Sequence, residues 1–189
     1  MLQASVTASA LSIRKEVSMG DIYVELARQS LTSYIADGKK LKLPEDLPDE
    51  LVNKRAGAFV SLHKNGDLRG CIGTIGPTTS CVAQEIINNA ISASTRDPRF
   101  PAVTADELPD LEINVDVLME PEDIDSLDEL DVRRYGVIVS TPDGRRGLLL
   151  PDLEGVDTVE EQVSIAMYKG GISSGENIYL QRFEVVRHT

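Results

Sequence analysis

The chain has 189 residues, with 31 aspartates and glutamates against 19 lysines and arginines and a formal net charge of −12. This charge repels DNA and RNA, and an aromatic content of 4 % leaves few side chains for base stacking, so we expect no nucleic-acid partner. Two cysteines are too few for a secreted disulfide scaffold, and no apolar run approaches the roughly 18 residues of a membrane span, so we expect a cytoplasmic protein without a membrane partner.

Residues 1–17 are expected to form a poorly ordered lead-in. Arg14 and Lys15 follow its weakly apolar stretch, which is the reverse of the order in a secretory signal. The remaining residues, 18–189, are expected to form one domain, and a chain of this length buries about 70 % of its unfolded surface.

The first periodic segment lies between Asp21 and Gly38, where apolar side chains recur at helical spacing and predict an amphipathic helix. Two prolines and four acids in residues 41–50 predict a surface connection. Two β-runs follow, joined by Asn65-Gly66, the dipeptide most typical of a two-residue hairpin loop.

A second helix is predicted within residues 77–95. Pro77 and the hydroxyl groups of the three residues after it suit a helix start, and an apolar face recurs with a period of 3.6 residues. That face consists of Val82, Ile86, Asn89, Ala90 and Ala93. The segment RDPRFP, residues 96–101, carries two prolines that end the helix.

The middle of the chain predicts one strand and a second hairpin. Residues 111–118 alternate between apolar and polar side chains, which predicts a half-buried strand with Glu112 and Asp116 on its polar face. After an acidic run, two further β-runs are joined by a turn at Asp143-Gly144.

The last part of the chain predicts a helix and a strand. Thr158 and Glu161 form a capping box that opens a helix ending at Gly170-Gly171, and residues 177–186 predict a final strand. Because most neighbouring strands are joined by tight turns, the chain predicts an α+β fold with a mostly antiparallel or mixed sheet flanked by helices.

The motifs LRGCIG at residues 68–73, RDPRFP at residues 96–101 and GLLLP at residues 147–151 resemble those of the AMMECR family. The family hallmark LRGCIG is complete at residues 68–73, and a helix ending in KGG stands where the family usually has Lys-Ala-Gly. Further matches are LHKNG at residues 62–66, RDPRFP at residues 96–101, the strand around residues 111–118 and GLLLP at residues 147–151. The resemblance covers roughly residues 20–187, and a six-residue hallmark followed by a second motif about 25 residues later is specific.

The resemblance implies an α+β fold in which a larger and a smaller subdomain form a cleft lined by LRGCIG. It also implies two partners, a radical S-adenosylmethionine enzyme and a Memo-like protein, which together define the AmmeMemoRadiSam system. It implies no particular reaction, so whether the chain is an enzyme stays open. Two departures from the family are the absence of a tryptophan after Pro151 and an altered sequence at residues 152–157.

The LRGCIG motif predicts a reactive thiol if it lies in a regular strand. Side chains then alternate, so Arg69 and Cys71 share one face while Leu68 and Ile72 point into the core. A fixed cation beside a thiol lowers the pKa of the thiol and favours the nucleophilic thiolate. Cys71 is therefore a candidate nucleophile or redox thiol, and Arg69 is its candidate activating cation.

The same motif also has a purely structural interpretation. Gly70 and Gly73 would let either a ligand or another part of the backbone approach closely. Free cysteines are among the most buried residue types and are usually inert, so Cys71 could equally be a packing residue. Cys81 lies on a predicted helix without charged neighbours, and we expect it in the core.

A thiolate catalyst usually needs a base, and the chain has two histidines. With a two-residue hairpin loop, His63 lies opposite Leu68 and on the face away from Cys71. With a three-residue loop and a bulge, it lies opposite Arg69 and on the same face as Cys71. We favour the two-residue loop, which argues against a Cys–His pair. His188, next to the end of the sequence, is expected to be exposed.

The RDPRFP segment is the second candidate site. Arg96 and Arg99 could clamp a carboxylate or phosphate group of a ligand. Alternatively, Asp97 and Arg99 form a salt bridge that fixes the loop while Phe100 packs in the core. Glu112 could supply a carboxylate, although the polar face of a strand is usually solvated.

These observations leave two classes of function. The first is a cleft for a small anionic molecule in which Cys71 and Arg69 are catalytic and the other candidates bind the substrate: Arg96, Asp97, Arg99, Gly70, Gly73, His63 and Glu112. The second is a non-enzymatic adaptor or binding module in which LRGCIG is structural. We expect neither a cofactor nor a metal, because CxxC and HExxH spacings are absent and the acidic run lacks the pattern of an EF-hand.

Overall fold

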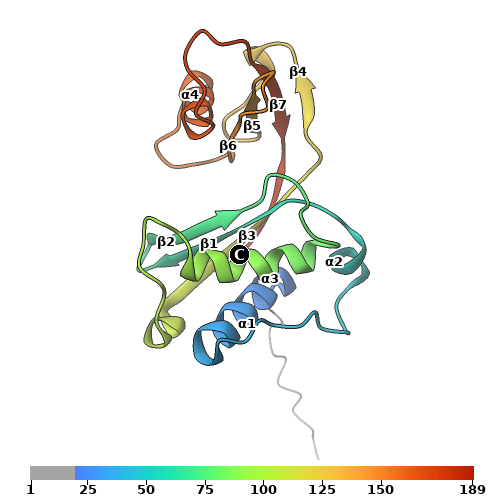
Figure 1. The fold of residues 1–189 in the computed structure, drawn as a ribbon, viewed down its shortest axis with the longest axis vertical. Helices are drawn as coiled ribbons and strands as arrows, with labels where there is room; N and C mark the ends of the chain where they lie inside the picture. Colours follow the sequence, from blue (N-terminus) through green and yellow to red (C-terminus); the bar gives the residue numbers. More distant parts are fainter. Residues whose placement is uncertain (1–19) are drawn as a thin grey trace, which may run out of the picture.

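The computed structural model describes residues 20–189, which form two units stacked one above the other (Figure 1). The predicted lead-in, residues 1–17, lies outside the described part of the chain. Each unit is built on a four-stranded sheet in which all pairs of neighbouring strands are antiparallel. The predicted α+β class with a mostly antiparallel sheet is therefore confirmed.

The larger subdomain contains most of the helices and the LRGCIG motif. Its elements are α1 (Ile22–Asp37), α2 (Asp49–Asn53), β1 (Ala58–Lys64), β2 (Asp67–Gly73), α3 (Val82–Thr95), the 3₁₀ helix η1 (Ala105–Asp110), β3 (Leu111–Leu118) and β8 (Val185–His188). The strand order is β2-β1-β3-β8, and helices α1 and α3 pack against one face of this sheet. The opposite face is left for the smaller subdomain.

The smaller subdomain consists of a second sheet and one long helix. Its elements are β4 (Glu122–Ile124), the 3₁₀ helix η2 (Leu127–Glu129), β5 (Gly136–Ser140), β6 (Arg146–Leu149), α4 (Val159–Lys169) and β7 (Tyr179–Phe183). The strand order is β4-β7-β5-β6. The predicted capping box of Thr158 and Glu161 opens α4, which packs against this sheet.

Three apolar clusters hold these elements together. The first lies between the larger sheet and helices α1 and α3, and the second lies between the smaller sheet and α4. The third joins the two subdomains and consists of the buried residues Leu118, Ile138, Leu148, Leu150 and Phe183. Because its members come from both sheets, burial of this cluster fixes the position of one subdomain on the other.

Several boundaries fall where the sequence predicts them. The Asp21 side chain accepts a hydrogen bond from the Tyr23 N–H (2.8 Å) at the start of α1. Gly38 ends this helix with a left-handed φ of 68°. Asn65 and Gly66 have φ values of 54° and 86°, and two successive positive values are what a type I′ hairpin loop requires.

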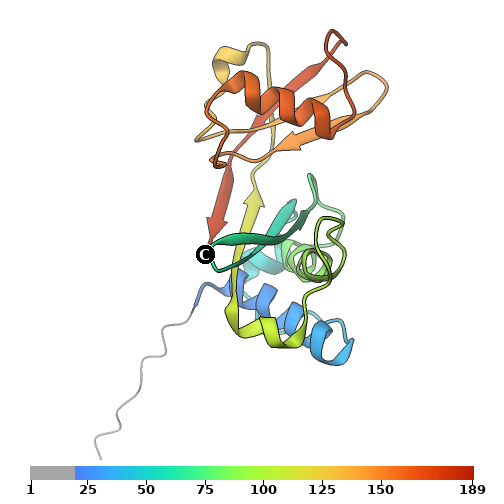
Figure 2. The same cartoon turned by 90° about the vertical axis from the view of Figure 1, so that its left-hand side faces the viewer.

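The prediction of one final strand over residues 177–186 is wrong in one respect. This part of the chain forms two strands, β7 and β8, which belong to different sheets. β7 pairs with β4 and β5 in the smaller subdomain, whereas β8 pairs with β3 in the larger one (Figure 2). The chain crosses at Glu184, whose carbonyl accepts a hydrogen bond from the Met119 N–H (2.9 Å). Side-chain alternation has the same period in one long strand and in two strands placed end to end, so the pattern does not reveal the break.

The start of α3 differs from the prediction. Cys81 occupies the N-cap position without a side-chain hydrogen bond, and it is buried, as predicted for this cysteine. Two of the three hydroxyl groups expected at the helix start, those of Thr78 and Thr79, instead donate to the buried carboxylate of Glu85 (2.7 Å each). The hydroxyl group of Thr74 also donates to this carboxylate (2.7 Å). Burial alone would raise the pKa of Glu85, but these hydrogen bonds outweigh it and lower the pKa.

The prediction that His188 is exposed is wrong. Its Nδ1 lies 2.7 Å from a carboxylate oxygen of Asp21, and its ring stacks on Tyr23 with 3.7 Å between the ring centroids. Strand β8 therefore brings the end of the sequence back against the first turn of α1, where the histidine is largely covered.

We predict that Gly70→Ala destabilises the protein. A Cβ atom at Gly70 would lie 2.3 Å from the carbonyl oxygen of Ala93 in α3, and overpacking of this kind costs about 1–3 kcal/mol. Gly76→Ala is the matched control, because a Cβ there meets nothing within 4 Å, and its free energy of unfolding should change by less than about 0.5 kcal/mol. Urea unfolding of the two variants gives both values, and equal stabilities would contradict the packing role of Gly70.

Candidate functional site

A pocket with a volume of about 420 Å³ lies between the two subdomains. Its floor is the face of the larger sheet that the helices leave uncovered, and its opposite wall comes from the segment after β6 and from the end of α4. The lining residues are Phe59, Ser61, His63, Leu68, Cys71, Arg99, Asn114, Asp116, Leu149, Leu150, Asp152, Leu153, Glu154, Lys169 and Arg187. The cleft between a larger and a smaller subdomain that the family resemblance implies is therefore present.

The floor of the pocket depends on a bulge in the β1–β2 hairpin. Ser61 pairs with Cys71 and Leu62 with Gly70, but the next residue, His63, pairs with Leu68. Strand β2 thus contains one residue more than β1 at this point, and the sense of its side-chain alternation reverses there. As a result, His63 and Cys71 line the same pocket, although the hairpin loop has the predicted two residues.

The bulge overturns three predictions about the orientation of side chains. His63 does not lie on the face away from Cys71. Leu68 is not a core residue, since it lines the pocket and is 39 % exposed. Arg69 does not share the pocket face with Cys71, because it is the extra residue of β2 and its side chain extends toward η1. Ile72, by contrast, packs against the main core as predicted.

Three neighbours hold Cys71 in place, one at its thiol and two at its backbone. Ser61, directly across from it on β1, donates a hydrogen bond from Oγ to the sulfur (3.2 Å). The Cys71 N–H donates to a carboxylate oxygen of Asp97 (2.9 Å), and its carbonyl accepts from the Arg99 guanidinium (3.3 Å). The residue is partly buried and is not in a disulfide, so the sulfur is fixed in place while it faces the pocket.

The RDPRFP loop contains the predicted Asp97–Arg99 salt bridge. The guanidinium of Arg99 binds the carboxylate of Asp97 through two nitrogens (2.9 and 2.7 Å). These hydrogen bonds are the largest cause of a strongly lowered pKa of Asp97, and they raise the pKa of Arg99. Asp97 is buried, whereas the side chain of Arg99 is 53 % exposed at the pocket wall. Arg96 is exposed and does not line the pocket. The predicted clamp of Arg96 and Arg99 is therefore not formed in the pocket.

Arg69 is engaged with the loop before β3. Its guanidinium donates to both carboxylate oxygens of Glu107 (3.0 Å each) and to the carbonyl of Pro101 (2.9 Å). Lys64 also binds Glu107 (3.2 Å). The hydrogen bonds from Arg69 are the largest cause that lowers the pKa of Glu107 to about 2. Arg69 therefore fastens η1 to the hairpin instead of facing the thiol.

The two glycines of the motif make room for protein atoms. A Cβ at Gly70 would meet the backbone of α3, and a Cβ at Gly73 would lie 2.2 Å from the ring of Phe59. Of the two interpretations of these glycines, close approach to other parts of the protein is the one that the structure supports.

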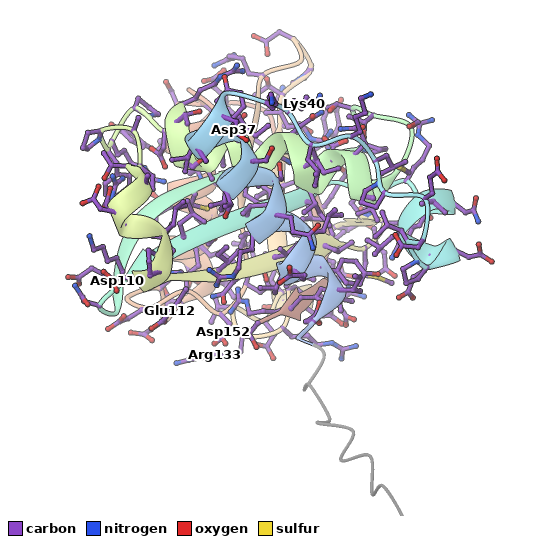
Figure 3. The ribbon with its side chains drawn as sticks, turned by 90° about the horizontal axis from the view of Figure 1, so that it is seen from below. Asp37, Lys40, Asp110, Glu112, Arg133 and Asp152 are labelled. Carbon is purple, nitrogen blue, oxygen red and sulfur yellow. The ribbon has the colours of Figure 1, made fainter. Side chains whose placement is uncertain are left out.

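The remaining sequence candidate, Glu112, lies outside the pocket. It is exposed on β3 opposite His63, at the rim of the larger sheet (Figure 3). Asp116, from the same polar face, is buried in the pocket and binds Arg187 of β8 through two nitrogens (2.8 and 3.3 Å). Hydrogen bonding to Asp116 raises the pKa of Arg187. The polar face of β3 is therefore solvated at one end and part of the pocket at the other.

Lys169 enters the pocket from the smaller subdomain and was not a sequence candidate. It is the last residue of α4, in the KGG segment that resembles a family motif. Lys169 is solvent-accessible, but the surrounding protein removes part of the water around its ammonium group. This desolvation is the largest cause of its lowered pKa. The sequence signal that could have found it is the position of a cation at a helix end next to two glycines.

The segment after β6 forms the pocket wall at residues where the sequence departs from the family. Asp152 has a φ of 52° and binds Arg133 (3.2 Å), and Figure 3 shows the two side chains next to each other. Asp152 and Glu154 add two carboxylates to the lining that also contains the cations Arg99 and Lys169.

Comparisons with known proteins agree with this architecture. A model of the AMMECR1 family matches residues 24–188. The chain belongs to the AMMECR1 family. A protein of Thermotoga maritima is 51 % identical over 168 residues, which are 88 % of this chain and 96 % of that protein. A protein of Clostridium acetobutylicum is 52 % identical over 169 residues, but this chain spans only 36 % of its length.

A crystal structure of another protein has a similar fold. An uncharacterized protein from Pyrococcus horikoshii superposes with a TM-score of 0.81 at 32 % sequence identity, and the match covers 89 % of both chains. The family model thus supports the assignment to the family, and the crystal structure supports the fold class.

Residues 20–189 contain no group of three or more histidine, cysteine, aspartate or glutamate side chains placed to hold a metal ion. In the same part of the chain, no helix is both long enough and apolar enough to cross a membrane.

We predict that Glu107→Gln removes a pH-dependent part of the stability. The folded-state pKa of Glu107, about 2, lies below the ordinary value of 4.5, so its contribution is present above about pH 4.5 and is lost as the pH falls toward 2. The variant should be about 1–3 kcal/mol less stable at pH 7, and the difference should shrink at pH 3. Urea unfolding at several pH values measures it, with Glu112→Gln as the exposed control. A difference that stays constant with pH would contradict the role of the Arg69–Glu107 pair.

Proposed function

We propose that this AMMECR1-family protein binds a small anionic molecule in the pocket between its subdomains and that Cys71 is the group that reacts with it. The observation that carries the proposal is the position of the Cys71 sulfur, which is fixed by Ser61 in a lining that also contains Arg99 and Lys169. A pocket of about 420 Å³ has the size of a small-molecule site.

Arg99 and Lys169 are suited to hold the anionic group of the ligand. Asp97 fixes the orientation of Arg99 and occupies two of its nitrogens, while the exposed part of the guanidinium remains toward the pocket. Lys169 forms no ion pair within residues 20–189, and it approaches from the opposite subdomain. Arg187 is also paired with a buried carboxylate, that of Asp116, and its side chain is less exposed than that of Arg99 (36 % against 53 %), so it is less suited. An anion between Arg99 and Lys169 would lie beside the thiol.

Cys71 is suited to act as a nucleophile in this position. Positive charge from Arg99 and Lys169 stabilises negative charge that develops on the sulfur or on the bound ligand. His63 follows Ser61 on the same face of β1 and is the candidate base for the thiol proton. Arg99 is the candidate activating cation in place of Arg69, because Arg69 forms a salt bridge with Glu107.

The proposal includes the cellular setting that the family resemblance implies. In that setting the protein is cytoplasmic and acts with a radical S-adenosylmethionine enzyme and a Memo-like protein. The anionic ligand would then be a substrate or product that passes among the three proteins.

A non-enzymatic adaptor is the second candidate function. The observation that favours it is the packing of the LRGCIG motif, in which Gly70 and Gly73 accommodate protein atoms and the Cys71 N–H is bound to Asp97. In this case Cys71→Ser would preserve function, whereas a thiol-dependent activity would be lost.

We predict that Cys71 reacts preferentially with an anionic alkylating agent. The probes are iodoacetate and iodoacetamide, which differ in charge. The same thiolate attacks the CH₂ carbon of either reagent and displaces iodide, so the ratio of the two rates reports the electrostatics of the pocket. With Cys81→Ala to leave a single thiol, this ratio should exceed that of free cysteine at least about threefold and should fall in Arg99→Gln and Lys169→Met variants. Arg96→Gln, in the same loop but outside the pocket, should leave it unchanged.

Mass spectrometry of quenched reactions measures both rates. A ratio equal to that of free cysteine would contradict the anion site. Failure of both reagents to modify folded protein would contradict the reactive thiol and leave the adaptor as the better account.

A further inference from the structure

A second cavity, with a volume of about 530 Å³, lies at the junction of the subdomains and shares no lining residue with the Cys71 pocket. We call it the basic groove. Its lining consists of Lys54, Arg55, Ala56, Gly57, Ile75, Gly76, Pro77, Leu118, Met119, Glu120, Pro121 and Arg146. These residues come from the segment after α2, the segment after LRGCIG, the connection from β3 to β4, and the start of β6.

Part of the basic groove is apolar and open to solvent. Leu118 is buried in the cluster that joins the subdomains, and Ile75 packs against that cluster. Met119 follows Leu118 and is 43 % exposed. Methionine adapts its shape to irregular partners, so this part of the groove can accommodate an apolar side chain of another molecule.

Three cations surround this apolar part without a carboxylate partner in residues 20–189. Lys54 approaches the sulfur of Met119 (3.9 Å), Arg55 donates to the carbonyl of Thr79 (3.2 Å), and Arg146 donates to the side chain of Gln181 (2.9 Å). None of the three is in an ion pair, whereas Arg133, Arg134, Arg145 and Arg182 of the smaller subdomain all are. Glu120 is the single acidic residue among the lining side chains.

We propose that the basic groove binds an extended acidic segment of a partner protein, in which one apolar side chain is flanked by carboxylates. The apolar side chain would contact Met119 and Ile75, and the carboxylates would pair with Lys54, Arg55 and Arg146. Local charge complementarity supports this occupant, because unpaired cations gather here on a chain with a formal net charge of −12.

The same net charge argues for a short segment over a polyanion. A peptide with a few carboxylates meets only the basic groove, whereas a nucleic acid or an anionic membrane would extend past it onto the acidic remainder of the surface. The proposal does not depend on the reactivity of Cys71, because the two cavities have no residue in common.

The test is selection from a phage-displayed random heptapeptide library on the full chain, followed by fluorescence anisotropy with the enriched peptides. We expect sequences in which a large apolar residue lies between aspartates or glutamates, with micromolar dissociation constants that weaken at higher salt. The variant Lys54→Glu/Arg55→Glu/Arg146→Glu should bind them at least about tenfold more weakly.

Two controls make the result decisive. The variant Lys39→Glu/Lys40→Glu/Lys42→Glu has the same net charge but changes exposed lysines outside the groove (Lys40 is labelled in Figure 3), and it should bind normally. Cys71→Ser should also bind normally.

Thermal unfolding shows whether each variant is folded, and Met119→Ala tests the apolar contact without a change of charge. Enriched peptides without acidic residues, or equal binding by the two triple variants, would overturn the proposal, as would tighter binding of single-stranded DNA or anionic vesicles.

Discussion

One extra residue in strand β2 decides which side chains meet at the pocket. Because His63 pairs with Leu68 while Leu62 pairs with Gly70, Arg69 falls out of the regular alternation and turns toward Glu107. In a regular hairpin, Arg69 would lie beside the thiol and His63 on the opposite face of the sheet. The bulge changes both positions, so the imidazole of His63 lines the same pocket as the thiol, and the guanidinium in the lining next to this hairpin comes from Arg99.

The buried carboxylate of Asp97 connects this hairpin to the loop that carries Arg99. It accepts hydrogen bonds from the Cys71 N–H and from the guanidinium, so the backbone of the motif and the cation at the pocket wall are positioned by one group. Lys169 completes the lining from the other subdomain. The site is therefore shared between two separately packed cores, and the apolar cluster between the sheets keeps its halves together.

The sequence was informative wherever the signal was local. The caps of α1 and α4, the Asn65-Gly66 loop and the alternation of β3 follow from short patterns, and the motif-based assignment to the family is confirmed. The sequence was uninformative where the conformation or contacts of one residue depend on tertiary packing. The bulge, the break at Glu184 and the binding of threonine hydroxyls by Glu85 leave the local patterns unchanged, and so no propensity argument detects them.

An NMR spectrum of the imidazole groups shows whether His63 and Cys71 face the same pocket. The chain has two histidines, so His63→Gln assigns both side-chain signals in a ¹⁵N-labelled Cys81→Ala protein. Alkylation of Cys71 with iodoacetamide should shift the ring signals of His63 and leave those of His188, which stacks on Tyr23 outside the pocket, in place. Unchanged His63 signals after complete alkylation would contradict the bulged register and the site built on it.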